Sequence, residues 1–150
     1  MVRRAEPADA AEVARLLHDF NTEYDEPTPG VEVLTERVGR MMAEGEMTVL
    51  LGGEGPDGLA VLRFRPCFWI GSLTAHLQEL YVAPARRGQG IGRALLGAAM
   101  ETAREQGAAH MDLGTSTDNT AARALYESCG FTNREGAPDG PVMLYYERDL

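Results

Sequence analysis

The spacing of apolar residues divides the first third of the chain into a short strand and two helices. Residues 2–5 (VRRA) read as the strand. Apolar residues then recur every three or four positions, which predicts an amphipathic helix from a cap at Asp9 to about Tyr24. A similar stripe predicts a second helix over 33–44, and the segment YDEPTPG at 24–30 separates the two.

The middle of the chain has the composition of β-structure. The runs MTVLLGG at 47–53 and GLAVLRFR at 58–65 predict two strands joined by the turn EGPDG, and CFWIG at 67–71 extends the second strand. A longer strand, LTAHLQELYVAP, follows at 73–84 and ends at Pro84. Alternation places Leu77, Glu79 and Tyr81 on one face of it, unless a bulge changes the parity.

The last part of the chain alternates between helix and strand. A helix is expected from Gly90 to Glu105, with Gly107 ending it, followed by a strand at 110–116 and a helix at 119–130. The segment PVMLYYERDL at 141–150 reads as a final antiparallel strand near an edge of the sheet. The strand–helix–strand unit in the centre predicts a parallel, right-handed crossover within a mixed α/β fold.

Length and composition fit one domain spanning residues 1–150. Hydrophobic residues make up 44% of the chain and charged residues 25%, as in soluble globular proteins. No apolar run approaches the ~20 residues of a membrane span, and the N-terminal residues lack the apolar segment of a secretory signal. The expected location is the cytoplasm, with no membrane partner.

The charge pattern narrows the partners and the chemistry. The formal net charge is −9, which argues against nucleic acid as the main partner and is compatible with a cationic small molecule. All 14 basic residues are arginine, so no lysine nucleophile or Schiff base is available. The two cysteines and three histidines are scattered, and no metal site or disulfide is expected from their spacing.

Three glycines, at positions 88, 90 and 92, surround the start of the helix expected from Gly90, in the stretch RRGQGIGRAL that begins at Arg86. A helix N-terminus presents unpaired N–H groups and partial positive charge, so it binds anions. Glycines here would let a phosphate approach the backbone, and Arg86, Arg87 and Arg93 would add cationic donors. The alternative is a tight loop with surface arginines. Neither the P-loop nor the dinucleotide-binding fingerprint is met.

Two motifs resemble the GNAT superfamily of N-acyltransferases. The stretch LYVAPARRGQGIGRAL is similar to its acyl-CoA-binding signature, R/Q-x-x-G-x-G/A, at Arg87, Gly90 and Gly92. The stretch NTAARALYESCGF, from Asn119 to Phe131, matches a second signature at the expected distance. Together with the order of elements, they imply a mixed, mostly antiparallel sheet of six or seven strands, with a central parallel pair splayed in a V and about four flanking helices.

The resemblance also implies how acetyl-CoA is held, without a metal. The pantetheine amides would pair with the backbone of the strand at 77–83, and the pyrophosphate would lie on the amides of residues 88–93. The residues expected to contact the cosubstrate are Leu80, Tyr81, Val82, Arg87, Gly88, Gln89, Gly90, Ile91, Gly92, Arg93, Asn119 and Tyr126.

The implied reaction is direct attack of an amine on the thioester in a ternary complex. The amine must lose a proton, and Glu79 is the candidate base, acting through water. The N–H of Val82 would stabilise the oxyanion, and Tyr126 would protonate the leaving thiolate. Glu79 could instead be a solvated or substrate-binding carboxylate, and Tyr126 a half-buried core aromatic. Asn119 could cap its helix, which does not exclude a contact with the cofactor.

The acceptor is expected in a pocket built from the first two helices and their connection. That region carries five carboxylates, with Phe20 and Tyr24 between them on one helical face, which suits a cationic amine. Trp69 would line the other wall or fill the core. The alternatives are a noncatalytic acyl-CoA-binding regulatory module and a protein or peptide N-acetyltransferase. A monomer and a homodimer both remain open.

Overall fold

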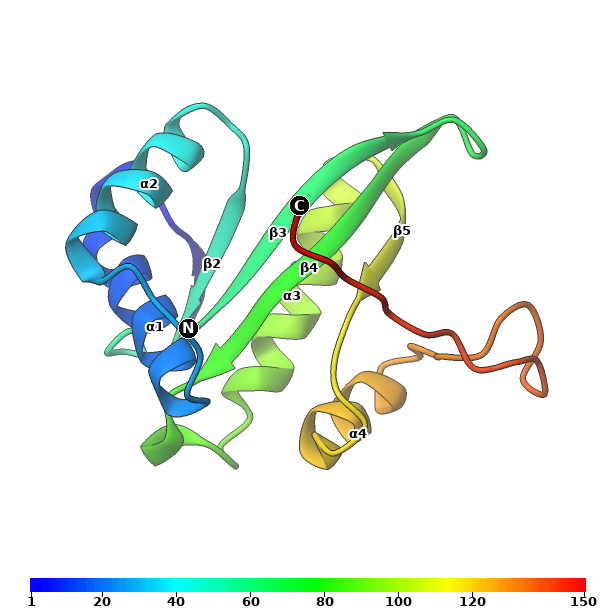
Figure 1. Cartoon of the computed structure of the whole chain (residues 1–150). Coiled ribbons are helices and arrows are strands. Elements are labelled where there is room, and N and C mark those ends of the chain that lie inside the picture. Colours follow the sequence, from blue (N-terminus) through cyan, green and yellow to red (C-terminus); the bar gives the residue numbers. More distant parts are fainter. The chain divides into compact units, whose positions relative to one another are not determined.

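A five-stranded sheet organises the first of two compact units in the structure, a computed structural model that describes residues 1–150. This unit spans Met1–Leu113, and its strands lie in the sheet in the order in which they occur in the chain (Figure 1). Neighbouring strands are antiparallel except for the last pair, which is parallel. The strands are β1 (Val2–Arg4), β2 (Thr48–Gly52), β3 (Gly58–Cys67), β4 (Ser72–Val82) and β5 (Ala108–Leu113).

Three helices cover the two faces of this sheet. On one face α1 (Ala10–Glu23) and α2 (Val31–Ala43) pack together, and on the other lies α3 (Ile91–Glu105), which makes the crossover from β4 to β5 (Figure 1). Short 3-10 turns, η1 (Pro7–Asp9) and η2 (Pro84–Arg86), precede α1 and the loop before α3. The expected helices and the mixed sheet with one parallel pair are confirmed, but the pair β4–β5 lies at one edge of the five strands instead of in the centre.

The face under α1 and α2 holds the main apolar cluster. Leu16 of α1 is completely buried, and Leu51, Leu59 and Val61 contribute side chains from the sheet. These residues alternate along β2 and β3, so every second side chain enters the same layer. Tyr81 of β4 closes the cluster at the end nearest to the loop before α3.

The opposite face is shaped by a pair of glycines. Gly52 and Gly58 are cross-strand partners in β2 and β3, and the side chain of Leu95 from α3 lies over both. A Cβ atom at Gly52 would lie 3.0 Å from the Leu95 side chain, and one at Gly58 would lie 3.2 Å from it and also 2.6 Å from the carbonyl oxygen of Tyr81 in β4. The missing side chains therefore let α3 approach the sheet closely.

A bulge in β4 changes which residues share a face. Val61 of β3 pairs with Glu79, and the next residue, Leu62, pairs with Leu77, so Gln78 is the extra residue. Adjacent residues of β3 point to opposite faces. Glu79 and Tyr81 thus share the α1 face as expected, but placing Leu77 there was wrong, because the bulge puts it on the α3 face.

The second unit, Gly114–Leu150, contains α4 (Thr120–Ser128). The strand expected at 141–150 was wrong. Only Val142 forms a bridge, with Arg134, and the backbone of Met143 bonds to Asn133. Residues 144–146 are apolar or aromatic, as is common in strands, but within this unit residues 144–150 have no backbone partner to pair with, and extended backbone needs one. The sheet therefore has five strands instead of six or seven.

The connection between β3 and β4 leaves two aromatic side chains outside the core. Phe68 and Trp69 contact each other, with ring centroids 4.8 Å apart, and Trp69 is 83% exposed. The expectation that Trp69 fills the core was wrong, since the hairpin of β3 and β4 extends beyond the helices that pack on the sheet (Figure 1).

No helix of the structure is both long and apolar enough to span a bilayer.

Candidate functional site

Strands β4 and β5 separate five residues before the C-terminal end of β4. Their parallel pairing ends at Leu77 with Leu113, while β4 continues to Val82 beside β3 alone. From Gln78 onward, the edge of β4 that faced β5 is therefore open. The first unit thus contains the divergence of the two strands that the resemblance implied.

The hydrogen-bond pattern shows which backbone groups lie on that open edge. Ala83 donates to the carbonyl of Asp57 at 2.8 Å, so this pair faces inward between β3 and β4. In an antiparallel ladder such pairs alternate, which turns the backbone of Tyr81 toward β3 and that of Leu80 and Val82 away from it. The N–H and C=O groups of Leu80 and the N–H of Val82 are thus presented at the edge.

The loop after η2 leads this edge to the N-terminus of α3. Gly88 and Gly90 adopt left-handed φ angles of 75° and 86°, a conformation that other residues rarely take. A Cβ atom at either position would meet nothing within 4 Å. The N–H groups of residues 88–92 form no hydrogen bond within the protein. The loop therefore presents a row of open donors, the arrangement that binds phosphate.

Two of the arginines predicted to surround this loop bind carboxylates of the protein. Arg86 pairs with Asp57 at 3.2 Å, and its Nε donates to Gln89. Arg87 donates through Nη1 and Nη2 to both oxygens of Glu23, each at 2.8 Å, and through Nε to the carbonyl of Val82 at 2.9 Å. Arg87 thereby ties the C-terminal end of α1 to the loop. A phosphate contact of Arg87 or Arg93 stays a prediction.

Tyr81 lies between that ion pair and the apolar cluster. The Arg87 guanidinium lies 5.7 Å from the centre of its ring, and Phe20 of α1 stacks on it at 4.9 Å. Burial, reinforced by Glu23, raises the pKa of the Tyr81 hydroxyl above its usual range. Its side chain therefore fixes α1 against β4, whereas its backbone pairs with β3.

Glu79 is half-buried on the α1 face of the same strand. Burial raises the pKa of its carboxyl above the ordinary value, and His76 opposes this rise. A carboxylate whose pKa is raised by desolvation is a better proton acceptor at neutral pH. This environment suits the base predicted at this position.

The structure also assembles a polar cluster that the sequence pattern did not reveal. Nδ1 of His76 lies 2.6 Å from Oδ1 of Asp112, and Arg65 donates to the other oxygen of that carboxylate at 3.0 Å. His76 and Asp112 are register partners in the parallel β4–β5 pair, one step before the strands separate. Only the register of strands 36 residues apart brings them together, so their spacing carried no signal.

The second unit holds the two predicted site residues of the later motif. Asn119 is the N-cap of α4, and its side chain accepts a hydrogen bond from the N–H of Ala122 at 3.4 Å. Its predicted role as a helix cap is confirmed. Tyr126 lies on α4 and packs edge-on to Phe131 at 6.1 Å. Contacts of Asn119 and Tyr126 with the cosubstrate stay predictions.

The region predicted to bind the acceptor is aromatic and acidic. Phe20 and Tyr24 of α1 contact each other edge-to-face at 5.4 Å, and Tyr24 is half exposed. Glu23 is occupied by Arg87, and Asp19 lies 3.7 Å from Arg15. The exposed acids of the connection between α1 and α2, Asp25 and Glu26, remain available to a cation.

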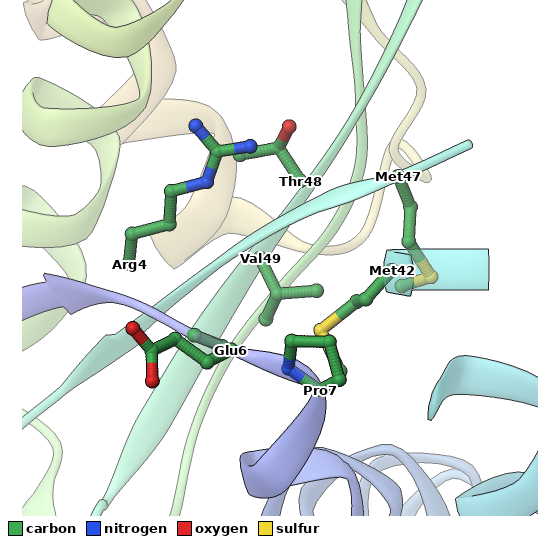
Figure 2. A pocket seen from close by; sticks show the side chains of 8 residues that line it. Arg4, Glu6, Pro7, Met42, Met47, Thr48 and Val49 are labelled. Carbon is green, nitrogen blue, oxygen red and sulfur yellow. The ribbon is translucent and has the colours of Figure 1, made fainter. Parts of the chain in front are cut away.

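A cavity of about 270 Å³ lies elsewhere in the first unit, and none of the predicted site residues lines it. Met42, Met47 and Pro7 line this cavity together with Arg4 and Glu6 (Figure 2).

The structure contains no group of three or more His, Cys, Asp or Glu side chains that could hold a metal ion. The candidate site is the open edge of β4 together with the glycine loop, because both present backbone groups without a partner in the protein.

Comparisons with known proteins agree with this geometry. The model of the acetyltransferase (GNAT) family matches residues 11–131. Aminoglycoside N(6')-acetyltransferase type 1 of Stenotrophomonas maltophilia is 32% identical over 138 residues, covering 89% of this chain and 87% of that protein. Thialysine N-epsilon-acetyltransferase of Bos taurus is 28% identical over 152 residues, covering 91% and 88%.

A solved structure extends the likeness to the whole chain. The crystal structure of a proposed acetyltransferase from Arthrobacter sp. FB24 superposes with a TM-score of 0.91 at 50% identity, covering 100% of this chain and 96% of that one. The fold and both sequence motifs therefore lead to the same family.

Proposed function

The chain belongs to the acetyltransferase (GNAT) family and is an acetyl-CoA-dependent N-acetyltransferase, and from this premise we propose that its acceptor is the primary amine of a small, cationic molecule. The acetyl group would pass by direct attack of the amine on the thioester while both substrates are bound.

One observation carries the proposal: the open edge of β4 runs into a glycine loop whose N–H groups have no partner. The free groups of Leu80 and Val82 suit the amides of pantetheine, which would add to β4 like a further strand. The donors of residues 88–92 suit a pyrophosphate at the start of α3. The fit depends on backbone groups, which the arginines bound to Asp57 and Glu23 leave open.

The chain's own residues divide the chemistry of the transfer. Glu79 accepts the proton that the ammonium group of the acceptor must lose, directly or through water. The N–H of Val82, at the open edge, donates to the oxyanion of the tetrahedral intermediate. Tyr126 supplies a proton to the leaving sulfur and is restored by the proton that the nitrogen of the intermediate gives up as the amide forms. Each role follows the family resemblance, and for Glu79 and Val82 the positions in β4 support it.

The acceptor class rests on charge and on relatives. Asp25, Glu26 and the half-exposed ring of Tyr24 offer carboxylates and an aromatic face, which together favour an ammonium group. The similar proteins are named for aminoglycoside and thialysine acetylation, and both substrates carry amines on small molecules. We therefore place a small amine ahead of a protein lysine or N-terminus.

A thiol-release assay with acetyl-CoA and a panel of amines tests the proposal. The panel contains an aminoglycoside, a lysine analogue, a polyamine and a basic peptide, and mass spectrometry identifies the acetylated product. We expect release with at least one small cationic amine and none with the peptide. Binding of acetyl-CoA without release across the panel would favour a noncatalytic module, and acetylation of the peptide alone would favour a protein acetyltransferase.

Variants of the same protein locate the cosubstrate and the acid. Gly90→Glu places a negative charge in the loop and should lower acetyl-CoA affinity by more than tenfold. Gly107→Glu is its matched control, because Gly107 at the other end of α3 also has a left-handed φ and open space around it. Equal affinity in the two folded variants contradicts the site. Tyr126→Phe should keep acetyl-CoA binding and lower kcat.

A further inference from the structure

We propose that His76 and Asp112 form a proton relay that receives the proton collected by Glu79 and releases it to solvent. The inference rests on the proposed function and names two residues that the family motifs do not contain. His76 would carry the proton, and Asp112 would act as a positioning residue that holds the imidazole.

The pairing of the two side chains is built into the sheet. His76 and Asp112 are directly opposed in the parallel β4–β5 ladder, and Nδ1 of the imidazole lies 2.6 Å from Oδ1 of the carboxylate. Arg65 reaches Oδ2 of the same carboxylate from β3 at 3.0 Å. Three neighbouring strands therefore hold Asp112 as a charged acceptor for the ring.

This hydrogen bond decides which ring nitrogen can accept a proton. A carboxylate only accepts, so Nδ1 of His76 must be the nitrogen that carries hydrogen. Nε2 is then left with its lone pair and is the basic atom of the neutral ring. When Nε2 takes a proton, the hydrogen bond from Nδ1–H to Asp112 keeps the ring in the same orientation.

The position of the pair connects it to Glu79. His76 is opposite Arg63 in β3, two residues along from Val61, the partner of Glu79, so His76 and Glu79 share the α1 face. The bulge at Gln78 brings this about, since plain alternation would put residues 76 and 79 on opposite faces. The electrostatic effect of His76 on the Glu79 carboxyl agrees with this proximity.

The other charges around His76 come from each neighbouring element. Arg63 and Arg65 lie on β3, and His110 lies two residues before Asp112 on β5, on the same face. From α1, Asp19 and Glu23 act on Tyr81 further along β4 and pair with Arg15 and Arg87. Asp112 is the single carboxylate bonded to the ring, and it is shared with Arg65 alone.

The proton balance of the relay is complete within the chain and solvent. The ammonium group of the acceptor gives its proton to the carboxylate of Glu79. Glu79 passes it to Nε2 of His76, directly or through water, and is restored as a carboxylate. The imidazolium releases the proton to bulk water, which the 37% exposure of the His76 side chain permits.

A purely structural role is the alternative, because the cluster also ties three strands together. A conservative substitution distinguishes the two roles: it should lower kcat if the pair carries protons, and leave kcat unchanged if the pair only joins the strands. His76→Gln keeps a donor for Asp112 but cannot take up a proton, and Asp112→Asn keeps the shape but removes the charge that holds Nδ1–H. His110→Gln is the matched control, a histidine on the same face of β5 that makes no hydrogen bond in the structure.

The test measures kcat and KM against pH for the four proteins, using an amine that the wild-type protein acetylates. We expect His76→Gln to lower kcat at neutral pH by about tenfold or more and to flatten its acid limb, with KM for acetyl-CoA unchanged. Asp112→Asn should lower kcat less, and His110→Gln should match the wild type. A wild-type kcat and pH profile in His76→Gln would overturn the relay and leave the proposed function standing.

A second measurement reads the tautomer without turnover. Long-range 1H–15N correlation spectra of the protein labelled at its histidines should show hydrogen on Nδ1 of His76, with His76→Gln used for assignment, and loss of that preference in Asp112→Asn. Hydrogen on Nε2 of His76 overturns the relay even if the enzyme is active. A wild-type protein that acetylates no amine overturns the proposed function and the relay together.

Discussion

At the scale of single residues, Arg87 is a position of the sequence motif that also has a structural role within the protein. Its spacing with Gly90 and Gly92 matches a cosubstrate signature, yet in the structure its guanidinium holds Glu23 and the carbonyl of Val82. The bidentate ion pair raises the pKa of Arg87 and fixes the loop to α1. Glu23 is thus removed from the acids available to a cationic substrate.

Asp9 carries a prediction about stability and pH. Its carboxylate binds Arg3 through two hydrogen bonds of 2.9 Å and accepts from the N–H of Glu6, which lowers its pKa from 3.8 to about 2. A depressed pKa means that the folded state favours the carboxylate. This stabilisation is complete above about pH 4 and disappears as the pH falls through about 2.

Asp9→Ala should therefore lower the free energy of unfolding by about 1 kcal/mol at pH 7, as expected for a lost capping interaction. Thermal unfolding at pH 7, 4 and 2.5 measures it, and the difference from the wild type should shrink at the lowest pH. Asp149→Ala, exposed near the C-terminus, serves as the control. A difference that does not change with pH would mean that the ion pair is not its source.

At the scale of elements, β4 combines the features on which the site depends. Its first half pairs with β5 and holds His76 beside Asp112, while its second half has the open edge at which we propose that acetyl-CoA binds. The bulge between the halves turns Leu77 and Glu79 to opposite faces. Under the proposed function, one strand would supply both the backbone groups that bind acetyl-CoA and the carboxylate that takes up the proton.

The close approach of β3 and β4 gives a prediction about Gly58. Gly58→Ala would place a Cβ atom 2.6 Å from the Tyr81 carbonyl oxygen, a backbone atom that cannot rotate away. We expect a loss of about 1–3 kcal/mol in the free energy of unfolding. Because this strain would move β4 at the open edge, acetyl-CoA affinity should also fall.

Gly97→Ala is the matched change for that experiment. Gly97 is exposed within α3 and has nothing within 4 Å of the added atom, so the substitution should raise stability by about 0.5–1 kcal/mol. Urea unfolding of the two variants distinguishes them by sign. A stabilising effect of Gly58→Ala would show that the close approach of β3 and β4 at this pair is not required.

At the scale of the whole molecule, the net charge of −9 bears on substrate capture. An acidic protein attracts polycations, and salt screens that attraction. We expect KM for an amine with several positive charges to rise several-fold between about 50 and 500 mM salt, and KM for a monoamine to rise less. Steady-state kinetics at constant pH measures both KM values. An equal rise of KM for the two amines would show that the net charge does not contribute to acceptor binding.

The sequence alone indicated most of the helices and strands and the position of the glycine loop before α3. Apolar periodicity predicted α1, α2 and α3 to within a few residues, because amphipathic helices and alternating strands depend on local spacing. The sequence explained these glycines by the access that they give a phosphate, and their left-handed φ angles in the structure supply a second reason, since glycine adopts that conformation without steric cost. The two motifs indicated the family as well, because each is a short run of residues whose spacing is fixed along the chain.

Tertiary structure decided what depends on register and on pairing partners. The bulge at Gln78 set the face of Leu77, and the parallel register of β4 and β5 joined His76 to Asp112 across 36 residues. The composition of residues 141–150 predicted a strand that the structure lacks, because a strand forms only where another backbone pairs with it. Local sequence sets which backbone shapes are available, whereas long-range hydrogen bonding selects among them.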